Sequence, residues 1–228
     1  MWSFWRPSSP AASSSCSKAS TGAELDTPIK LYVYASADDL QGAMIFPQEW
    51  TGGVAYTRYG ILAIGIAPSE LDWGKRAIVH ELTHLVVHQE TLNPYGDIPT
   101  WLDEGLAIYS EGPLEATFSG YLNTAIAGGT LISVPSLASP FSVFSDQAAL
   151  SYAESYTLVD FLVTTYGEDK MSALLGAFRE GNTYDGALQA VYGFDMEGLD
   201  ALWRPWITEP AAVPAPTASL LEPVLAGT

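Results

Sequence analysis

Apolar and polar side chains alternate over residues 29–35, a period-two pattern that predicts a β-strand. Residues 36–42 then resemble a short helix. Two further stretches, 54–59 and 61–66, have β-strand character and flank a glycine, which predicts a hairpin or a bent strand. The pattern therefore predicts a small β-region at the start of the folded part of the chain.

From Ser69 onward the pattern becomes helical. Ser69-Glu70-Leu71-Asp72 resembles a capping box and predicts a helix that runs to about Gln89. A similar start at residues 99–103 predicts a short helix that ends near Gly112. Later helices are expected at 147–166, 168–180, 184–192 and 196–207. A small β-region followed by helices predicts an α+β fold.

The two ends of the chain differ in composition from the middle. Residues 1–27 are rich in Ser, Ala and Pro and are expected to form a flexible leader, and residues 209–228 resemble a Pro/Ala-rich tail or linker. Residues 28–208 are then the one folded domain, which is long enough to bury a sizeable core. Cys16 is the only cysteine, so the chain cannot form an intrachain disulfide.

The charge balance excludes several classes of partner. The formal net charge is −17, from 26 acidic and 9 basic residues. Such a surface repels phosphate backbones and anionic lipids, so we expect neither nucleic-acid binding nor membrane-surface binding. No apolar run approaches the roughly 20 residues of a membrane span. The acidity fits a secreted protein or one from a salty habitat, and we expect an extracellular or cell-surface protein of bacterial type whose signal segment is not part of this sequence.

A metal-binding pattern lies inside the first long predicted helix, at His80-Glu81-Leu82-Thr83-His84. Residues four apart lie on nearly the same helix face, so both imidazoles can reach one ion. Zinc takes nitrogen ligands at about 2.0–2.1 Å and keeps one position for water in catalytic sites. Glu81 lies beside the two rings, where it can act as general base. Unpaired ionisable groups would be costly in so apolar a helix.

The segment Trp101-Leu102-Asp103-Glu104-Gly105-Leu106-Ala107 adds a carboxylate that can complete the metal shell. HELTH followed by WLDEGLA resembles the peptidase MA-like group of gluzincins, relatives of thermolysin and aminopeptidase N. The resemblance covers about residues 28–208. It implies a gluzincin fold, with a small N-terminal sheet and an active-site helix followed by a mainly helical subdomain. It also implies one catalytic zinc ion held by His80, His84 and Glu104.

Two neighbours of the expected ligands need separate interpretation. Asp103 falls three residues after Thr100, where a capping box places its acid, so we expect it to bond the backbone and Glu104 to bind the metal. His88 lies roughly 12 Å along the helix from His80, too far to share the ion. It is expected to stabilise the helix C-terminus or to support Glu104.

Two further roles follow from the resemblance. In aminopeptidase-N-like enzymes a tyrosine at the start of a later helix hydrogen-bonds the oxyanion; Tyr152 matches that position, and Tyr156 competes with it. A packing role for Tyr152 stays open as well. In relatives the strand before the motif helix binds the substrate, which indicates residues 60–66 here.

The chain also departs from the family pattern. Aminopeptidase-N-like enzymes carry GxMEN, whose Glu binds the free amine of the substrate, whereas this chain has Gly42-Ala43-Met44-Ile45-Phe46. The sequence therefore favours an endopeptidase. Ile108, four residues after Glu104, offers no carboxylate to support a ligand histidine.

The sequence thus predicts a zinc-dependent peptidase that acts on a peptide or protein, with Glu81 and Tyr152 as catalytic residues. The alternative is a noncatalytic, zinc-containing surface module that binds peptides. The presence of Glu81 favours the enzyme, because a structural zinc site needs no base and closes with four protein ligands.

Overall fold

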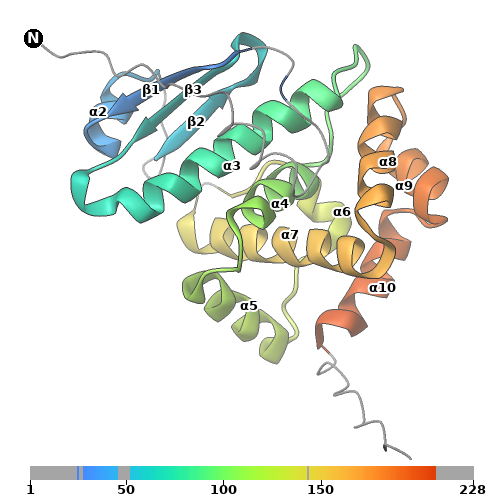
Figure 1. Ribbon diagram of the computed structural model, residues 1–228. Coiled ribbons are helices and arrows are strands. Elements are labelled where there is room, and N and C mark those ends of the chain that lie inside the picture. The colour runs from blue at the N-terminus through green and yellow to red at the C-terminus, as the bar shows by residue number, and fades with distance from the viewer. Residues whose placement is uncertain (1–24, 26–27, 46–51, 143, 209–228) are drawn as a thin grey trace, which may run out of the picture.

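A three-stranded sheet opens the fold in the computed structural model, which describes residues 25, 28–45, 52–142 and 144–208 (Figure 1). The strands are β1 (Lys30–Tyr34), β2 (Gly53–Tyr56) and β3 (Ile61–Gly65). Their order is β1-β3-β2, with β1 parallel and β2 antiparallel to β3. The short helix α2 (Ala37–Gly42) follows β1 and begins where the Ser36 hydroxyl accepts the Asp39 N–H. A one-turn helix, η1 (Thr57–Tyr59), joins β2 to β3.

The long helix α3 (Leu71–Glu90) covers one face of this sheet. Leu62 and Ile64 of β3 pack there against Leu85 of α3 and are almost fully buried. The predicted capping box at the start of this helix was wrong. A tight turn, η2 (Pro68–Glu70), precedes α3, and no side chain caps the first turn of the helix.

The rest of the described chain is helical. It comprises α4 (Thr100–Glu111), α5 (Ala116–Gly128), α6 (Val134–Leu137), α7 (Ser145–Tyr166), α8 (Glu168–Arg179), α9 (Tyr184–Tyr192) and α10 (Met196–Thr208). The predicted α+β fold is therefore confirmed. None of the described helices combines the length and apolar character needed to cross a bilayer.

Helices α5 and α6 were not predicted from the sequence. Helix α5 contains Gly120 and Asn123, which are weak helix formers, so its local preference is low. Its buried side chains, Leu122 and Ala125, lie on the side that contacts α7. Tertiary packing therefore stabilises α5 where intrinsic propensity does not.

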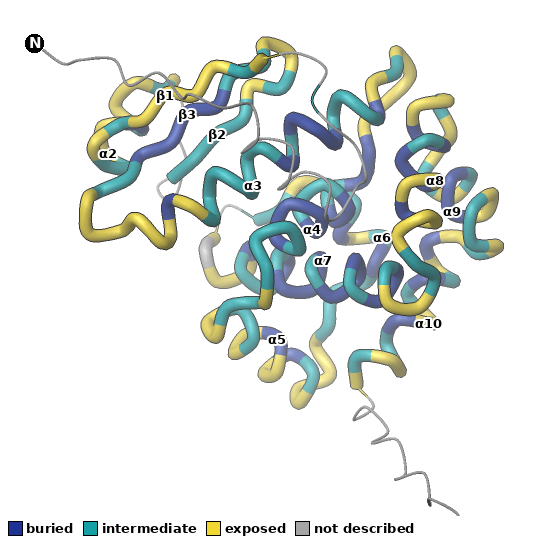
Figure 2. The backbone as a smooth tube through the Cα atoms, viewed as in Figure 1, coloured by how far each residue is buried: buried dark blue, intermediate teal, exposed yellow. Residues whose placement is uncertain are grey.

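The centre of the helical part is the crossing of α4 and α7, both of which are mostly buried in Figure 2. Trp101, Leu102 and Leu106 of α4 are fully buried in this core. A Cβ atom at Gly105 would lie 2.5 Å from the Ser155 carbonyl oxygen of α7. The two backbones can approach this closely only because residue 105 has no side chain. This contact fixes the position of Glu104, the neighbouring residue.

Replacing Gly105 by Ala is expected to lower the free energy of unfolding by about 1–3 kcal/mol, because overpacking forces the two helices apart. Urea denaturation followed by circular dichroism measures the change. Gly120→Ala in α5 is the matched control, since no atom lies within 4 Å of its added Cβ. The control should be neutral or stabilising, because Ala is the better helix former. Equal stability of both variants would contradict the close packing of α4 on α7.

A buried polar network holds residues 131–134 against α7 and α10. Both carboxylate oxygens of Glu154 accept the Ile132 N–H at 3.1 Å, and the side chain is fully buried. Asp200 accepts the Val134 N–H at 2.9 Å and is paired with Arg204. Burial raises the pKa of Glu154 to about 8.

This raised pKa predicts a pH-dependent stability. At pH values between 4.5, the ordinary pKa of the Glu154 carboxyl, and about 8, its pKa in the folded protein, Glu154 is protonated in the folded state and ionised in the unfolded state. The free energy of unfolding therefore falls as the pH rises through this range. Glu154→Gln should remove this loss, on the order of 2–4 kcal/mol between pH 5 and 8. Urea unfolding of both proteins at the two pH values, in the same metal state, measures it. A wild-type stability that changes no more than that of the variant would contradict the prediction.

Candidate metal centre

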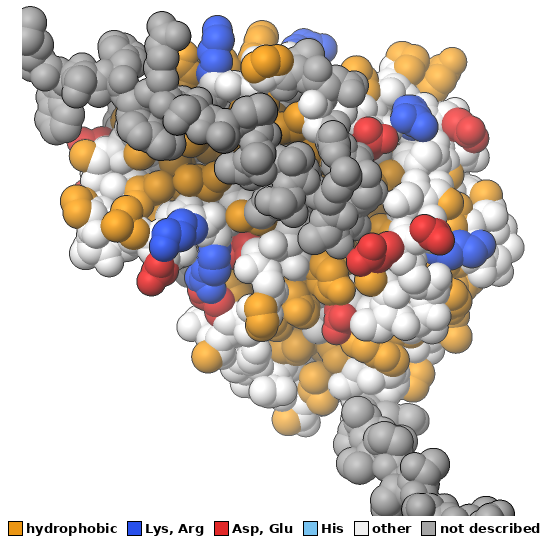
Figure 3. Space-filling model, viewed as in Figure 1, with side chains coloured by type: hydrophobic (Ala, Val, Ile, Leu, Met, Phe, Trp, Pro, Cys, Tyr) orange, Lys and Arg blue, Asp and Glu red, His pale blue; other side chains and the backbone are white. Residues whose placement is uncertain are grey.

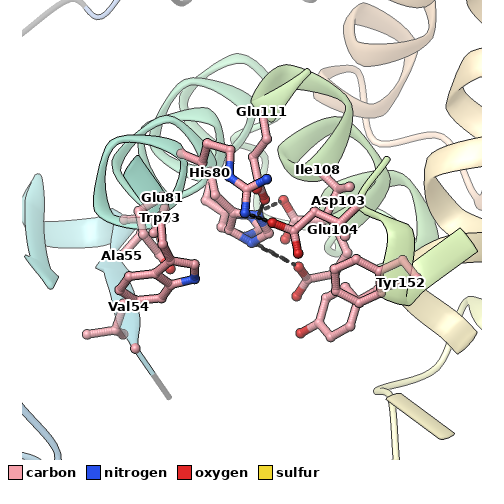
Figure 4. Close-up of a pocket in the computed structure, with 18 of the residues that line it drawn as sticks. Val54, Ala55, Trp73, His80, Glu81, Asp103, Glu104, Ile108, Glu111 and Tyr152 are labelled. Atoms are coloured by element: carbon pink, nitrogen blue, oxygen red, sulfur yellow. Dashed lines mark hydrogen bonds and ion pairs between the residues drawn. The ribbon is translucent and has the colours of Figure 1, made fainter. Parts of the chain in front are cut away.

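Helices α3 and α4 bring the three predicted metal ligands together (Figure 4). His80 and His84 lie one turn apart on α3, and Glu104 faces them from α4. The Glu104 Oε2 atom is 3.4 Å from His80 Nε2 and 3.6 Å from His84 Nε2. All three side chains are largely buried.

These separations fit a single cation between the three side chains. Ligand atoms about 2.0–2.1 Å from a tetrahedral ion lie about 3.3–3.4 Å from one another. Glu104 Oε2 is buried and has no hydrogen-bond partner among the described residues. A buried carboxylate oxygen without a partner is costly. A metal ion at this position would give that oxygen its partner.

Each predicted ligand histidine also contacts a carboxylate through Nδ1, the ring nitrogen that faces away from Glu104. His80 Nδ1 lies 2.8 Å from Glu111 Oε1, and His84 Nδ1 lies 2.8 Å from Asp103 Oδ1. Because a carboxylate accepts, each Nδ1 carries a proton, and Nε2 is the nitrogen of each ring that faces the proposed metal position. Ile108 cannot support a histidine, and Glu111 and Asp103 do so instead. Glu111 lies two helical turns after Glu104 on α4 and shares its face, a spacing that the sequence offered.

The predicted role of Asp103 as a capping residue was wrong. The residue before α4 is Pro99, and no side chain caps this helix. One Asp103 oxygen bonds His84, and the other lies 2.8 Å from His88 Nε2. His88 therefore supports Asp103 rather than Glu104. His84, His88 and Asp103 also lie close enough together to form a second possible metal group.

The opposite charges of the histidines and carboxylates at this site stabilise one another. Burial lowers the pKa of His80, but the neighbouring carboxylates of Glu104 and Glu111 outweigh burial and raise it to about 9. Burial raises the pKa of Glu104, but the two ligand histidines outweigh it and bring it to about 2. Because a metal binds neutral imidazole, a metal must displace protons from this cluster.

Glu81 points from α3 towards the sheet, next to β2. A Cβ atom at Gly53 would lie 2.8 Å from Glu81 Oε1, so a side chain at residue 53 would displace the carboxylate from this position. The Ala55 backbone also bonds Glu81. Burial raises the pKa of Glu81, whereas His80, His84 and the Ala55 bond lower it. A raised pKa suits a group that must take up a proton.

The strand beside the site is β2, and the prediction that residues 60–66 bind the substrate was wrong. Strand β3 (Ile61–Gly65) is paired on both edges, with β1 and with β2. It therefore has no free edge. Strand β2 is the edge strand of the described sheet that faces the cleft. Its residues Gly53, Val54 and Ala55 line the cleft.

The structure separates the two tyrosines that the sequence left as alternatives. Tyr152 of α7 lines the same cleft as the ligand histidines, and its ring contacts Phe118 and Phe141 edge-on. Burial, with nearby acidic groups, raises the pKa of Tyr152, so its phenol stays protonated. The Tyr156 ring packs against Tyr109 at a tilted angle, its hydroxyl bonds the Leu114 backbone, and it does not line the cleft.

The cleft has a volume of about 540 Å³ and extends along α3 on both sides of Glu81. Trp73 lies near one end, where Arg76 pairs with Glu115. Thr57 and His88 line the other end. The segment that was compared with GxMEN lies elsewhere, at the end of α2, where Ile45 is exposed and lines no part of the cleft.

Together, the small sheet, the helix with two histidines and a glutamate from the next helix define a metallopeptidase-like protein. The chain belongs to the Peptidase MA superfamily, whose sequence model matches residues 13–209. This match confirms the family that the two motifs indicated, and with it the gluzincin type of fold. Members of the superfamily are typically metal-dependent. A search of curated proteins finds no match for this chain.

Proposed function

We propose that this protein is a zinc-dependent peptidase that hydrolyses internal bonds of extended peptides. The observation that carries the proposal is the buried Glu104 Oε2 atom, which has no hydrogen-bond partner among the described residues and faces the Nε2 atoms of His80 and His84. The opposite nitrogens of both rings, the Nδ1 atoms, are fixed by carboxylates. The Glu81 carboxylate beside this group and the edge position of β2 in the described sheet support a hydrolytic role.

Zinc is the metal that suits this donor set best. Two imidazoles and one carboxylate are a common ligand set in zinc hydrolases, and three protein ligands leave one position open. When bound, zinc supplies Lewis acidity towards the attacking water and the scissile carbonyl. Glu111 and Asp103 would hold the two imidazoles in place for it.

Glu81 is the proposed general base. Its carboxylate lies beside the ligand histidines but is not one of the three converging groups. It would take the proton from the attacking water and deliver it to the leaving amine. The protonated phenol of Tyr152 would donate a hydrogen bond to the oxyanion.

The substrate is proposed to pair with β2 as an added strand. The Gly52 carbonyl accepts the N–H of Gly65 on β3 at 2.9 Å, so alternate residues of β2 direct their backbone groups to β3. Gly53 and Ala55 direct theirs to the other edge of β2, which is unpaired in the described sheet and where Glu81 accepts the Ala55 N–H. Main-chain pairing there suits any extended peptide.

An endopeptidase fits this cleft better than an aminopeptidase. Trp73 and His88 lie roughly 12 and 10 Å from Glu81 along α3, in opposite directions, so a peptide can extend both ways. The lining residues of β2 and η1 carry no acid that would bind a free amine. The acidic composition supports action outside the cell, with residues 28–208 as the catalytic domain and peptides or proteins as substrates.

Metal analysis combined with a peptide-library digest tests the proposal. We expect one zinc ion per chain, cleavage within peptides, loss of cleavage with a chelator, and recovery on adding zinc. Circular dichroism of the chelated protein controls for unfolding. Stoichiometric zinc without cleavage of any peptide would instead indicate the noncatalytic binding module. Cleavage that persists without metal would refute the metal-dependent mechanism.

A further inference from the structure

The sheet face opposite α3 carries a hollow of about 350 Å³ beside β2, an edge strand of the described sheet. We call it the tyrosine hollow; among its lining residues are Tyr32, Tyr34, Tyr56, Tyr59, Ile61 and Ala63. Tyr56 is 40% exposed and Tyr59 is 71% exposed, so their rings are accessible. Hydrophobic side chains are visible over the sheet end of the molecule in Figure 3.

Tyr56 links this hollow to the cleft. Side chains alternate along β2, so Gly53 and Ala55 face α3 and Glu81, whereas Val54 and Tyr56 face away from α3. Because β2 is an edge strand of the described sheet, an added strand would place its own side chains directly beside Tyr56.

The position of Glu81 sets the register of such a strand. Glu81 contacts β2 at both Gly53 and Ala55, so the residue with the scissile carbonyl should lie opposite Val54, between them. Antiparallel pairing is the more stable arrangement. In that arrangement the residue opposite Tyr56 comes two positions before the scissile residue, towards the N-terminus of the substrate. Directly opposed residues point to the same face of a sheet.

We propose that Tyr56 is a specificity-determining residue, which selects an aromatic or β-branched side chain two positions before the scissile residue. This inference rests on the proposed peptidase function. Aromatic rings form favourable cross-strand pairs with aromatic and β-branched side chains. The tyrosine hollow gives the selected side chain a further apolar surface. Such a contact corresponds to roughly a three- to tenfold preference in kcat/KM.

Matched peptides test the proposal. Three peptides share one cleavage site and differ only at the selected position, which carries Phe, Val or Ser. Mass spectrometry of the products confirms the bond that is cut. For the wild type, kcat/KM for Phe and Val should exceed that for Ser by roughly three- to tenfold. In Tyr56→Thr this ratio should fall towards one, and in Tyr56→Phe it should be kept. Thr suits a strand, so Tyr56→Thr should fold and retain zinc.

Tyr121→Thr is the matched control, since Tyr121 is 39% exposed and lies on α5, outside the cleft and the hollow. It should keep the wild-type ratio. An unchanged ratio in Tyr56→Thr, or a preference on the C-terminal side of the cut bond, would overturn the inference while leaving the peptidase function intact. A wild type that binds zinc but cuts none of a broad peptide library would refute both.

Discussion

Glu81→Gln is expected to abolish peptide cleavage while zinc stays bound. The substitution keeps the size of the side chain, and the amide oxygen can still accept the Ala55 N–H. It removes only the ability to take up a proton. Loss of a general base typically costs about 10²–10⁴-fold in rate. Zinc should be retained because the converging group of His80, His84 and Glu104 is unchanged.

Steady-state kinetics and zinc analysis on the same preparation measure both parts of this result. Glu90→Gln is the matched control, because Glu90 lies on the same helix and pairs only at the surface with Arg179. This control should keep near-normal activity, since exposed ion pairs contribute little. Near-normal cleavage by Glu81→Gln would refute the role of Glu81, whatever its zinc content.

Glu104→Gln is expected to lose both the metal and the activity. Among the described residues, Glu104 supplies the carboxylate that faces both Nε2 atoms, and the substitution removes it. Loss of a supporting residue behind a ligand typically weakens metal binding by about 10–100-fold, and loss of a ligand itself should exceed that. Competition with a chromophoric chelator measures the zinc affinity, and circular dichroism checks that the variant is folded.

Asp103→Asn serves as the comparison for Glu104→Gln. Asp103 bonds the Nδ1 atom of His84, which faces away from the proposed metal position. Its substitution should lower the zinc affinity by only about 10–100-fold. The order of the two effects therefore distinguishes the ligand from its support. If Asp103→Asn weakened zinc binding more than Glu104→Gln, the assignment of the third ligand would be wrong.

Most of the later helices could be predicted from the sequence. The observed bounds of α7 to α10 agree with the predicted ones to within two residues. Their apolar positions repeat at helical spacing, and glycines such as Gly167 and Gly193 end them. Helix α5 could not be predicted, because its stability depends on burial against α7 rather than on its own residues.

The metal-facing pair could also be predicted, because His80 and His84 are four residues apart on one helix and covalent geometry alone places them together. Glu104 needed the family motif in addition. The carboxylates of Glu111 and Asp103, which bond the Nδ1 atoms of the two histidines, were not predicted from the sequence. Asp103 has the spacing of a capping acid, and nothing in that spacing shows that α3 lies opposite.

The sequence by itself determined the helical motif and the group of His80, His84 and Glu104, and it indicated Glu81 as the proposed general base, since these depend on local spacing or on a family pattern. Only the tertiary structure decided which strand has the free edge, which tyrosine lines the cleft and which acids support the histidines. The physical reason is that these features depend on how separate elements pack. The order of the strands and the close contact of Gly105 with α7 set that packing, and no local periodicity encodes it.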